Sequence, residues 1–193
     1  TTASYNTAVG SNALLLNTTG ASNNAFGGTS LDANTTGQYN NAFGNNALGS
    51  NTTANYNSAF GENTLAANTT GAQNVALGSR ALESNTTAGN NIGIGYSALR
   101  ETTTGANNVG IGTDSLQQNT TGTQNVAVGT LALDACTTGG SNIAVGHNAL
   151  SANTTASNNT AVGRDAMRDT TTGTQNAAFG TAALYSNSTG NNN

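Results

Sequence analysis

Side chains that could carry out chemistry are few and isolated in this chain. Only 6% of the residues are charged, and there is one His, His147, and one Cys, Cys136. No Ser or Cys stands at a spacing from His147 that is typical of a catalytic site. Cys136 lacks the partners that a disulfide or a metal cluster needs, and Asp occurs irregularly, whereas calcium-binding repeats carry Asp at a fixed phase. We therefore predict no enzyme activity, no cofactor and no metal site.

A pair of hydroxyl side chains recurs every 17 residues, from Thr18 and Thr19 to Ser188 and Thr189. One interpretation is a structural ladder of side chains at a turn, which is the interpretation that we favour. The other is an ice-binding face, in which ranked Thr side chains order water. Adjacent residues of a strand point to opposite faces, so only one member of each pair could contribute to such a face.

Acceptor sequences for N-glycosylation recur with the same period. Glycans on every coil of a repeat protein would crowd at about 5 Å spacing, so we expect most of these sites to stay bare. The sites are Asn17, Asn34, Asn51, Asn68, Asn85, Asn119, Asn153, Asn158 and Asn187.

Aromatic residues gather toward the start of the chain. Tyr5, Tyr39 and Tyr56 share one place in the repeat, and Phe26, Phe43 and Phe60 share another. We interpret this cluster as a variation in packing, with a strip that contacts sugars as the alternative.

These residues are embedded in eleven tandem copies of one 17-residue unit, which fill residues 7–193 without insertion or deletion. The unit reads x-Ala-apolar-Gly-x-x-Ala-Leu-x-x-Asn-Thr-Thr-Gly-x-x-Asn, and its residues are numbered positions 1 to 17. A unit this short and uniform predicts a stacked solenoid. Residues 1–6 fit the end of a preceding unit, and no unit has the atypical polar sequence of a cap. We expect a window of a longer array or, alternatively, a chain whose ends join other copies in a filament.

Positions 1 to 3 of the unit have the pattern of a short β-strand. The volumes at positions 1 and 3 compensate, since Phe43 is paired with Asn41 and the smaller Ile111 with Val109. Residues two apart on a strand share one face. Position 2, on the opposite face, is always Ala or Gly, so we expect close packing there and a contact between chains.

Three further positions define candidate structural residues. Gly at position 4 is invariant, which predicts a positive φ at the corner after the strand, whereas the Gly at position 14 is replaced by Ala54, Ala88 and Ala156 and is expected to serve close packing. The corner glycines are Gly10, Gly27, Gly44, Gly61, Gly78, Gly95, Gly112, Gly129, Gly146, Gly163 and Gly180. The predicted core column at position 8 is Leu14, Leu31, Leu48, Leu65, Leu82, Leu99, Leu116, Leu133, Leu150, Met167 and Leu184. The predicted Asn ladder at position 17 is Asn23, Asn40, Asn57, Asn74, Asn91, Asn108, Asn125, Asn142, Asn159 and Asn176.

The fold that follows is all-β, a parallel β-solenoid (β-roll) of about eleven coils with 17 residues each. Gly, Asn and Thr disfavour a helix, and stacked coils would make a rod roughly 50 Å long. Each unit supplies only two or three sizeable apolar side chains, which is little to offset the cost of ordering 17 residues. We therefore expect self-association of chains along their length.

Charged residues occur only at positions 5, 6, 9 and 10, which predicts that this part of each coil faces solvent. The uncharged Asn-Thr-Thr-Gly-x-x-Asn side would then be either an interface or an internally hydrogen-bonded ladder. With four basic residues in all and a net charge of −4, nucleic-acid binding has no electrostatic basis. No apolar stretch approaches the length of a membrane span.

Segments such as Asn142-Ile-Ala-Val-Gly146 and Asn159-Thr-Ala-Val-Gly163, each followed by Ala and then Leu or Met, resemble the repeats of trimeric autotransporter adhesin heads. The longer form with Asn-Thr-Thr-Gly is similar to arrays in phage tail-fibre-like proteins, which often carry an endosialidase-type chaperone domain. This resemblance implies a left-handed parallel β-roll assembled as a homotrimer. The 17-residue unit departs from the shorter adhesin repeat.

We therefore expect a structural segment of an extracellular fibre, located outside the cell, at its surface or on a virion. It would form the shaft or head of a phage tail fibre, a surface adhesin or a free filament. A binding module for cell-surface glycans or a host surface is the alternative, and an ice-binding solenoid is the second alternative.

Overall fold

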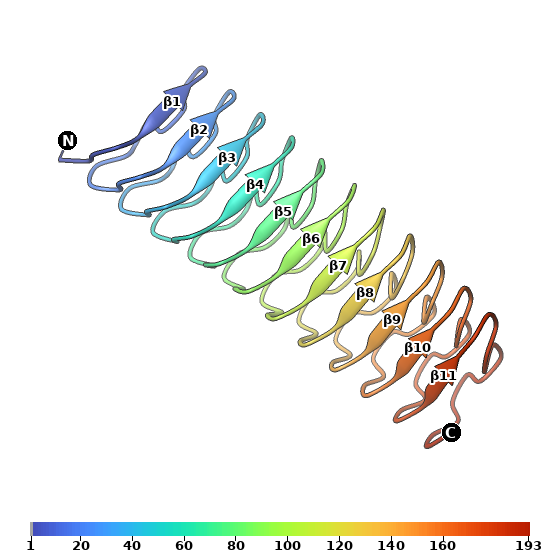
Figure 1. The fold of residues 1–193 in the computed structure, drawn as a ribbon. Helices are drawn as coiled ribbons and strands as arrows, with labels where there is room; N and C mark the ends of the chain where they lie inside the picture. The colour runs from blue at the N-terminus through green and yellow to red at the C-terminus, as the bar shows by residue number, and fades with distance from the viewer. Residues whose placement is uncertain (1) are drawn as a thin grey trace.

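The computed structural model describes residues 2–193, which form a rod of stacked coils with one three-residue strand in each coil (Figure 1). Coil n is the unit that begins with strand βn. The strands are β1 (Thr7–Val9), β2 (Asn24–Phe26), β3 (Asn41–Phe43), β4 (Ser58–Phe60), β5 (Val75–Leu77), β6 (Ile92–Ile94), β7 (Val109–Ile111), β8 (Val126–Val128), β9 (Ile143–Val145), β10 (Thr160–Val162) and β11 (Ala177–Phe179). The all-β parallel solenoid predicted from the repeat is confirmed.

All eleven strands belong to one parallel sheet in the order β1 to β11. Each residue pairs with its equivalent one unit away, as Val109 does with Val126. Hydrogen bonds between coils continue outside the strands: the Leu31 amide donates to the Ala47 carbonyl at 3.1 Å, and the Thr35 amide donates to the Thr52 carbonyl at 2.9 Å. The backbone is therefore bonded along the rod on every side of the coil.

The corner after each strand needs glycine for two reasons. All eleven position-4 glycines have φ between +120° and +142°, where a side chain is strained. A Cβ on Gly112 would also lie 2.7 Å from the carbonyl carbon of Gly129 in the next coil. At position 14, φ is not positive, and the native Ala54, Ala88 and Ala156 are each accommodated with 3% exposure.

Three other positions of each coil adopt positive φ without glycine. Positions 6 and 16 are mostly Asn, Asp, Ser and Gln, of which Asn and Asp enter this region most readily. Position 8 is unexpected, because all ten Leu residues there and Met167 have φ between +50° and +56°. This conformation costs roughly 1–2 kcal/mol for an L-residue, and it lets the amide bond to the next coil while the side chain enters the core.

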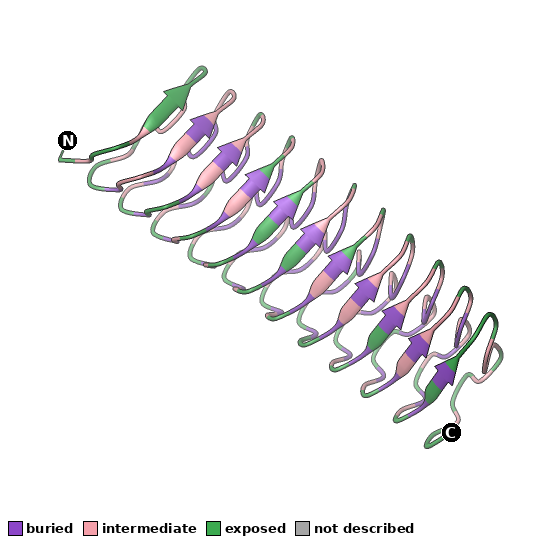
Figure 2. Cartoon of the chain, viewed as in Figure 1, coloured by how far each residue is buried: buried purple, intermediate pink, exposed green. Residues whose placement is uncertain are grey.

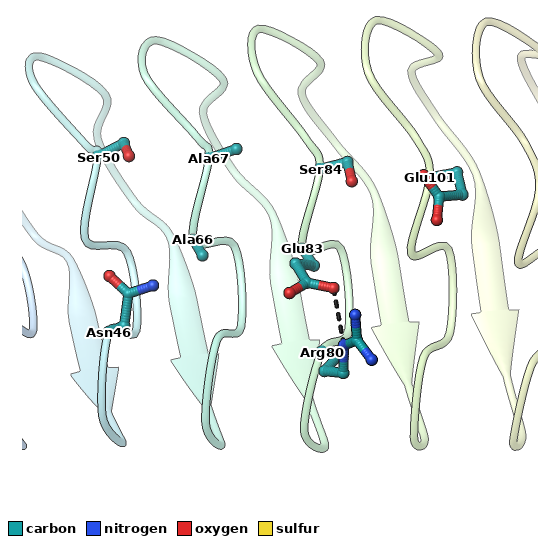
Figure 3. A pocket seen from close by; sticks show the side chains of 8 residues that line it. All are labelled: Asn46, Ser50, Ala66, Ala67, Arg80, Glu83, Ser84 and Glu101. Atoms are coloured by element: carbon teal, nitrogen blue, oxygen red, sulfur yellow. Dashed lines mark hydrogen bonds and ion pairs between the residues drawn. The ribbon is translucent and has the colours of Figure 1, made fainter.

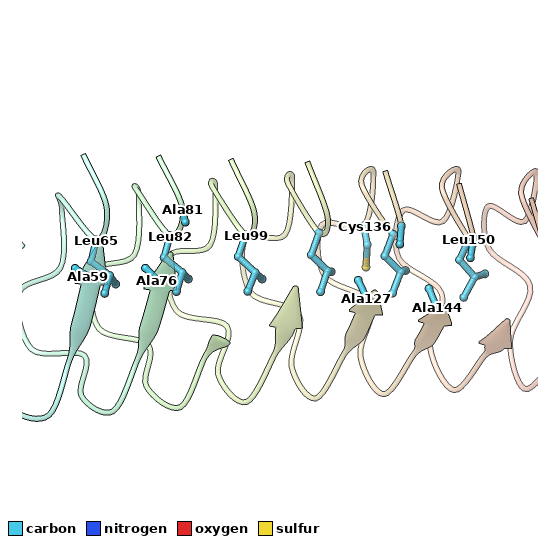
Figure 4. Close-up of a cluster of buried hydrophobic side chains, with 14 of the residues drawn as sticks. Ala59, Leu65, Ala76, Ala81, Leu82, Leu99, Ala127, Cys136, Ala144 and Leu150 are labelled. Carbon is cyan, nitrogen blue, oxygen red and sulfur yellow. The ribbon is translucent and has the colours of Figure 1, made fainter. Parts of the chain in front are cut away.

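The core is a single column of side chains running along the rod. The position-8 side chains from Leu31 to Met167 are fully buried. Figure 4 shows the central part of this column, where Leu65 and Leu82 lie beside the strand alanines Ala59 and Ala76. A Cβ on Gly110 would lie 3.1 Å from Cγ of Leu99. The interior therefore has room for one large side chain per coil, and position 2 must be small.

The expectation that position 2 forms a contact between chains is wrong. From Ala25 to Ala161 the alanines of position 2 have no exposed surface, because the leucine column of the same chain covers them. Positions 1 and 3 do share a face, but it is the outer face of the sheet. Figure 2 shows each strand from β2 to β11 buried at its centre and more exposed at both ends.

The two glycine positions make a matched test of the corner. We expect Gly112→Ala to lower the free energy of unfolding by about 2–4 kcal/mol, because it adds backbone strain to a clash with the next coil. A Cβ on Gly122, at position 14 of the same coil, would also clash with the Gly139 carbonyl oxygen. Its φ is not positive, however, and three coils carry a native Ala there, so Gly122→Ala should cost less than Gly112→Ala. Urea denaturation followed by circular dichroism measures both, and equal costs would contradict this account of the corner.

Candidate functional site

The charged residues line one edge of the rod, and most are engaged within their own coil. Arg80 Nε lies 2.9 Å from Glu83 Oε2, and the hydrogen bond to Glu83 is the largest cause of the raised pKa of Arg80. The other three arginines also contact an acidic residue of their own coil, in the pairs Arg100–Glu101, Arg164–Asp165 and Arg168–Asp169. Exposed pairs of this kind contribute little to stability.

A shallow hollow of about 520 Å³ lies on this edge (Figure 3). Its lining combines small residues with charges, namely Asn46, Ser50, Ala66, Ala67, Arg80, Glu83, Ser84 and Glu101. The hollow offers no nucleophile or base beyond these carboxylates and hydroxyls. Over residues 2–193 the structure brings together no group of three metal-ligating side chains, and His147 lies exposed at position 5.

One carboxylate on this edge is held in an unfavourable environment. Asp134 Oδ1 is buried without a hydrogen-bond partner. Burial is the main cause that raises the pKa of Asp134, and the nearby charge of Asp114 adds to it, while backbone hydrogen bonds from Asp134 and Ala135 oppose it. The ionised form of Asp134 is therefore disfavoured by the folded structure at neutral pH.

The position-17 asparagines form a continuous buried ladder. The Asn91 amide group donates to the Gly105 carbonyl at 2.9 Å, and its Oδ1 accepts the backbone amide of Asn108 at 2.8 Å. Equivalent bonds to the backbone amide link each coil to the next from Asn6 to Asn193. Each side chain thus ties its own coil to the next one, while its backbone amide donates to the asparagine of the preceding coil, as Asn91 does to Asn74 Oδ1 at 3.0 Å, which is a structural role.

A second asparagine ladder, at position 11, was not identified from the sequence. Asn85 Nδ2 donates to Asn68 Oδ1 at 2.8 Å and also to the Ala88 carbonyl. Thr102, Cys136 and Thr170 interrupt this ladder. Asn85 Oδ1 before Thr102, Asn119 Oδ1 before Cys136 and the Thr170 hydroxyl are left buried without a partner. The uncharged Asn-Thr-Thr-Gly side left an interface or an internally hydrogen-bonded ladder open, and the recurring Asn at position 11 was the signal for the ladder.

Cys136 is buried at its place in this ladder. Its thiol lies 3.6 Å from the Gly139 carbonyl, and burial raises the pKa of the thiol to about 11. The thiolate that nucleophilic or redox chemistry requires is therefore scarce at neutral pH.

The two threonines of each pair behave differently. The Thr35 hydroxyl, at position 12, donates to the Thr52 carbonyl at 3.0 Å, and the same bond recurs in other coils. Position 13, by contrast, is exposed in all eleven coils. The structural ladder therefore accounts for the first threonine of each pair, and a single exposed column remains.

Burial separates the glycosylation sequences into two groups. The acceptor amides of Asn34, Asn51, Asn68, Asn85, Asn119 and Asn153 belong to the position-11 ladder and have no exposed surface. Asn158, at position 16, is exposed. In the folded rod Asn158 is therefore the accessible acceptor in the interior coils.

The aromatic residues form two separate stacks. The rings of Phe26, Phe43 and Phe60 follow one another at 4.7 and 4.9 Å between centroids. Tyr39 and Tyr56 stack at 5.0 Å. Each ring contacts its equivalent in the neighbouring coil, so the cluster is a consequence of in-register stacking.

Comparison with family models, with curated proteins and with solved structures finds no match to this chain. No helix within residues 2–193 is long and apolar enough to cross a membrane. The repeat and its stacking are therefore the basis for any functional proposal.

The residues singled out from the sequence are brought together as columns along the rod rather than as a localised site. The corner glycines, the leucine column and the asparagine ladder each contact their own equivalents or the adjoining backbone of the neighbouring coils. Within residues 2–193 no three of the His, Cys, Asp and Glu side chains come together, although Glu83 and Glu101 line the same hollow and Asp114 lies near Asp134. The contact between chains that was expected at position 2 is instead the buried inner face of the sheet, and positions 1 and 3 form its outer face.

The interrupted ladder gives a test of the asparagine network. We expect Cys136→Asn to raise the free energy of unfolding by about 1–2 kcal/mol, because the new amide donates to the unpaired Asn119 Oδ1. The control is the same change in an Asn119→Ala background, where the gain should disappear. A gain that persists there would show that another contact is responsible.

Asp134 gives a test of the pH dependence. Its folded-state pKa is raised, so its contribution to stability is most favourable below the ordinary Asp pKa of about 3.9 and is lost as pH rises through the folded value. Asp134→Asn should therefore raise the urea midpoint at pH 7, and the difference from wild type should vanish near pH 3. Asp32→Asn, at the same position of coil 2, is the control, since no oxygen of Asp32 is buried without a partner. An equal gain in both variants would contradict the role of burial.

Proposed function

We propose that this chain is a structural segment of an extracellular fibre, forming the shaft or head of a phage tail fibre, a surface adhesin or a free filament. The observation that supports this most is that nearly every position with a recurring residue type in the eleven units serves the stacking of coils. Corner glycine, core leucine, both asparagines and the first threonine all serve contacts along the rod. Little of the repeated chemistry is left for a ligand.

The uniformity of the coils supports a role as a spacer rather than the recognition of one particular receptor. Eleven coils follow one another with unchanged strand length and register. A recognition site is normally a local departure from such a scaffold, built on a loop of distinct sequence. The coils of this rod differ mainly in single side chains, while the strand pairing and the position-17 ladder recur in every coil.

The two alternative functions have weaker support. Sugars stack on the faces of aromatic rings, but Tyr39 and Tyr56 lie parallel at 5.0 Å and cover each other's inner faces. Ice binding would rest on the position-13 threonines alone, because the position-12 hydroxyls are bonded to backbone carbonyls. A single column presents a narrow surface for ordering water.

The test is electron microscopy of the purified chain together with length variants. Removing residues 92–125, two whole units, should leave the sheet intact and shorten each rod by about 10 Å, at about 4.8 Å per coil. Removing residues 92–116, which breaks the phase of the repeat, is the control and should abolish the rod. Rod length that does not follow the number of units, or clear thermal hysteresis or glycan binding by the wild-type chain, would contradict the proposal.

A further inference from the structure

The outer sheet face, formed by positions 1 and 3 of β1 to β11, is apolar and open to solvent. In the interior coils, Leu77 is 48% exposed, Ile143 is 42% exposed and Val75 is 39% exposed. The fully buried leucine column lies on the other side of the same sheet. The chain therefore covers the inner face of the sheet with its own leucine column and leaves the larger apolar side chains of the outer face exposed.

No charged residue occurs at positions 1 to 4 of any unit. In β5 to β9 both outward positions are Val, Leu or Ile, and in β2 to β4 position 3 is the stacked column of Phe26, Phe43 and Phe60. The polar side chains on this face are short and partly satisfied by each other, as Asn24 is by Asn41 at 2.8 Å. Covering the face would therefore desolvate no charge.

The area of the face matches an interface between proteins. A large apolar side chain exposes on the order of 150–200 Å² when fully free, so this face presents roughly 700 Å² of apolar surface over its exposed and half-buried residues. The largest apolar patch on a typical monomer is about 300–600 Å², and a stable interface takes about 800 Å² from each partner. Parallel sheets are also normally covered on both faces.

We propose that a second copy of this chain packs lengthwise on the outer sheet face, an inference that rests on the proposed function as a fibre segment. The face repeats once per coil along the whole rod. A partner that contacts all of it must present side chains with the same period, and another rod of this sequence does so. Columns of Val, Ile and Phe from two copies would then form a second core between their sheets.

Charge variants on this face test the proposal by sedimentation equilibrium. Wild type should have a mass of at least two chains of 19.0 kDa, and the combination Ile94→Glu, Ile111→Glu and Val128→Glu should reduce it to one. The matched control is Tyr96→Glu, Thr113→Glu and Thr130→Glu at position 5 of the same coils, where Glu62 is native. This control should keep the wild-type mass. A single-chain mass for wild type, or an unchanged mass for the first variant, would overturn the proposal.

A cross-linking variant keeps the test decisive if three buried charges prevent folding. Ile111→Cys retains an apolar side chain, and the buried Cys136 does not compete for a thiol reagent. With a short bismaleimide, covalent dimers should form at least five-fold faster for Ile111→Cys than for the exposed Thr113→Cys. Equal rates would overturn the proposal. Single-chain rods seen by electron microscopy would leave the fibre proposal standing without this interface, whereas the absence of rods would contradict the fibre proposal itself.

Discussion

Bonding between equivalent residues of successive coils is the requirement that shapes this molecule. Each coil of 17 residues donates to and accepts from the coil before and the coil after it, in the strand and in the turns. Equivalent residues must therefore lie about 4.8 Å apart along the rod. The requirement explains the constant unit length, because one inserted residue would move every later side chain away from its column. It also explains why the corner carries glycine, whose Cβ-free backbone lies against the next coil.

Stacking in register also lets polar side chains occupy the interior. A buried amide is costly unless its hydrogen bonds are made, and a column of asparagines supplies each member with a partner in the next coil. Asn91 illustrates this, since both ends of its amide group are bonded. The cost appears in the position-11 ladder, where Cys136 leaves Asn119 Oδ1 buried without a partner. The thin leucine core and the asparagine ladders together take the place of the wide apolar core of a globular domain.

Much of this arrangement could be read from the unit itself. The strand, the corner glycine, the leucine column and the position-17 ladder follow from spacing and from which substitutions the unit contains. The faces of the strand were harder to assign, because alternation shows only that positions 1 and 3 lie opposite position 2. The small residue at position 2 suggested a contact with a second chain, yet the interior admits one large side chain per coil, and the Leu that occupies that space packs against position 2. The position-11 ladder could not be chosen over an interface from the sequence, because an uncharged polar side is compatible with both.

The sequence alone established a parallel solenoid of 17-residue coils, since the period, the invariant glycine and the apolar columns each constrain the backbone locally. It also located the charges on one edge. The tertiary structure decided which face of the sheet is inside, because that depends on how far Leu82 or Leu99 reaches across the coil. It likewise decided that leucine adopts positive φ at position 8. No local preference of leucine predicts that conformation, and it is held by hydrogen bonds to the next coil together with complete burial of the side chain.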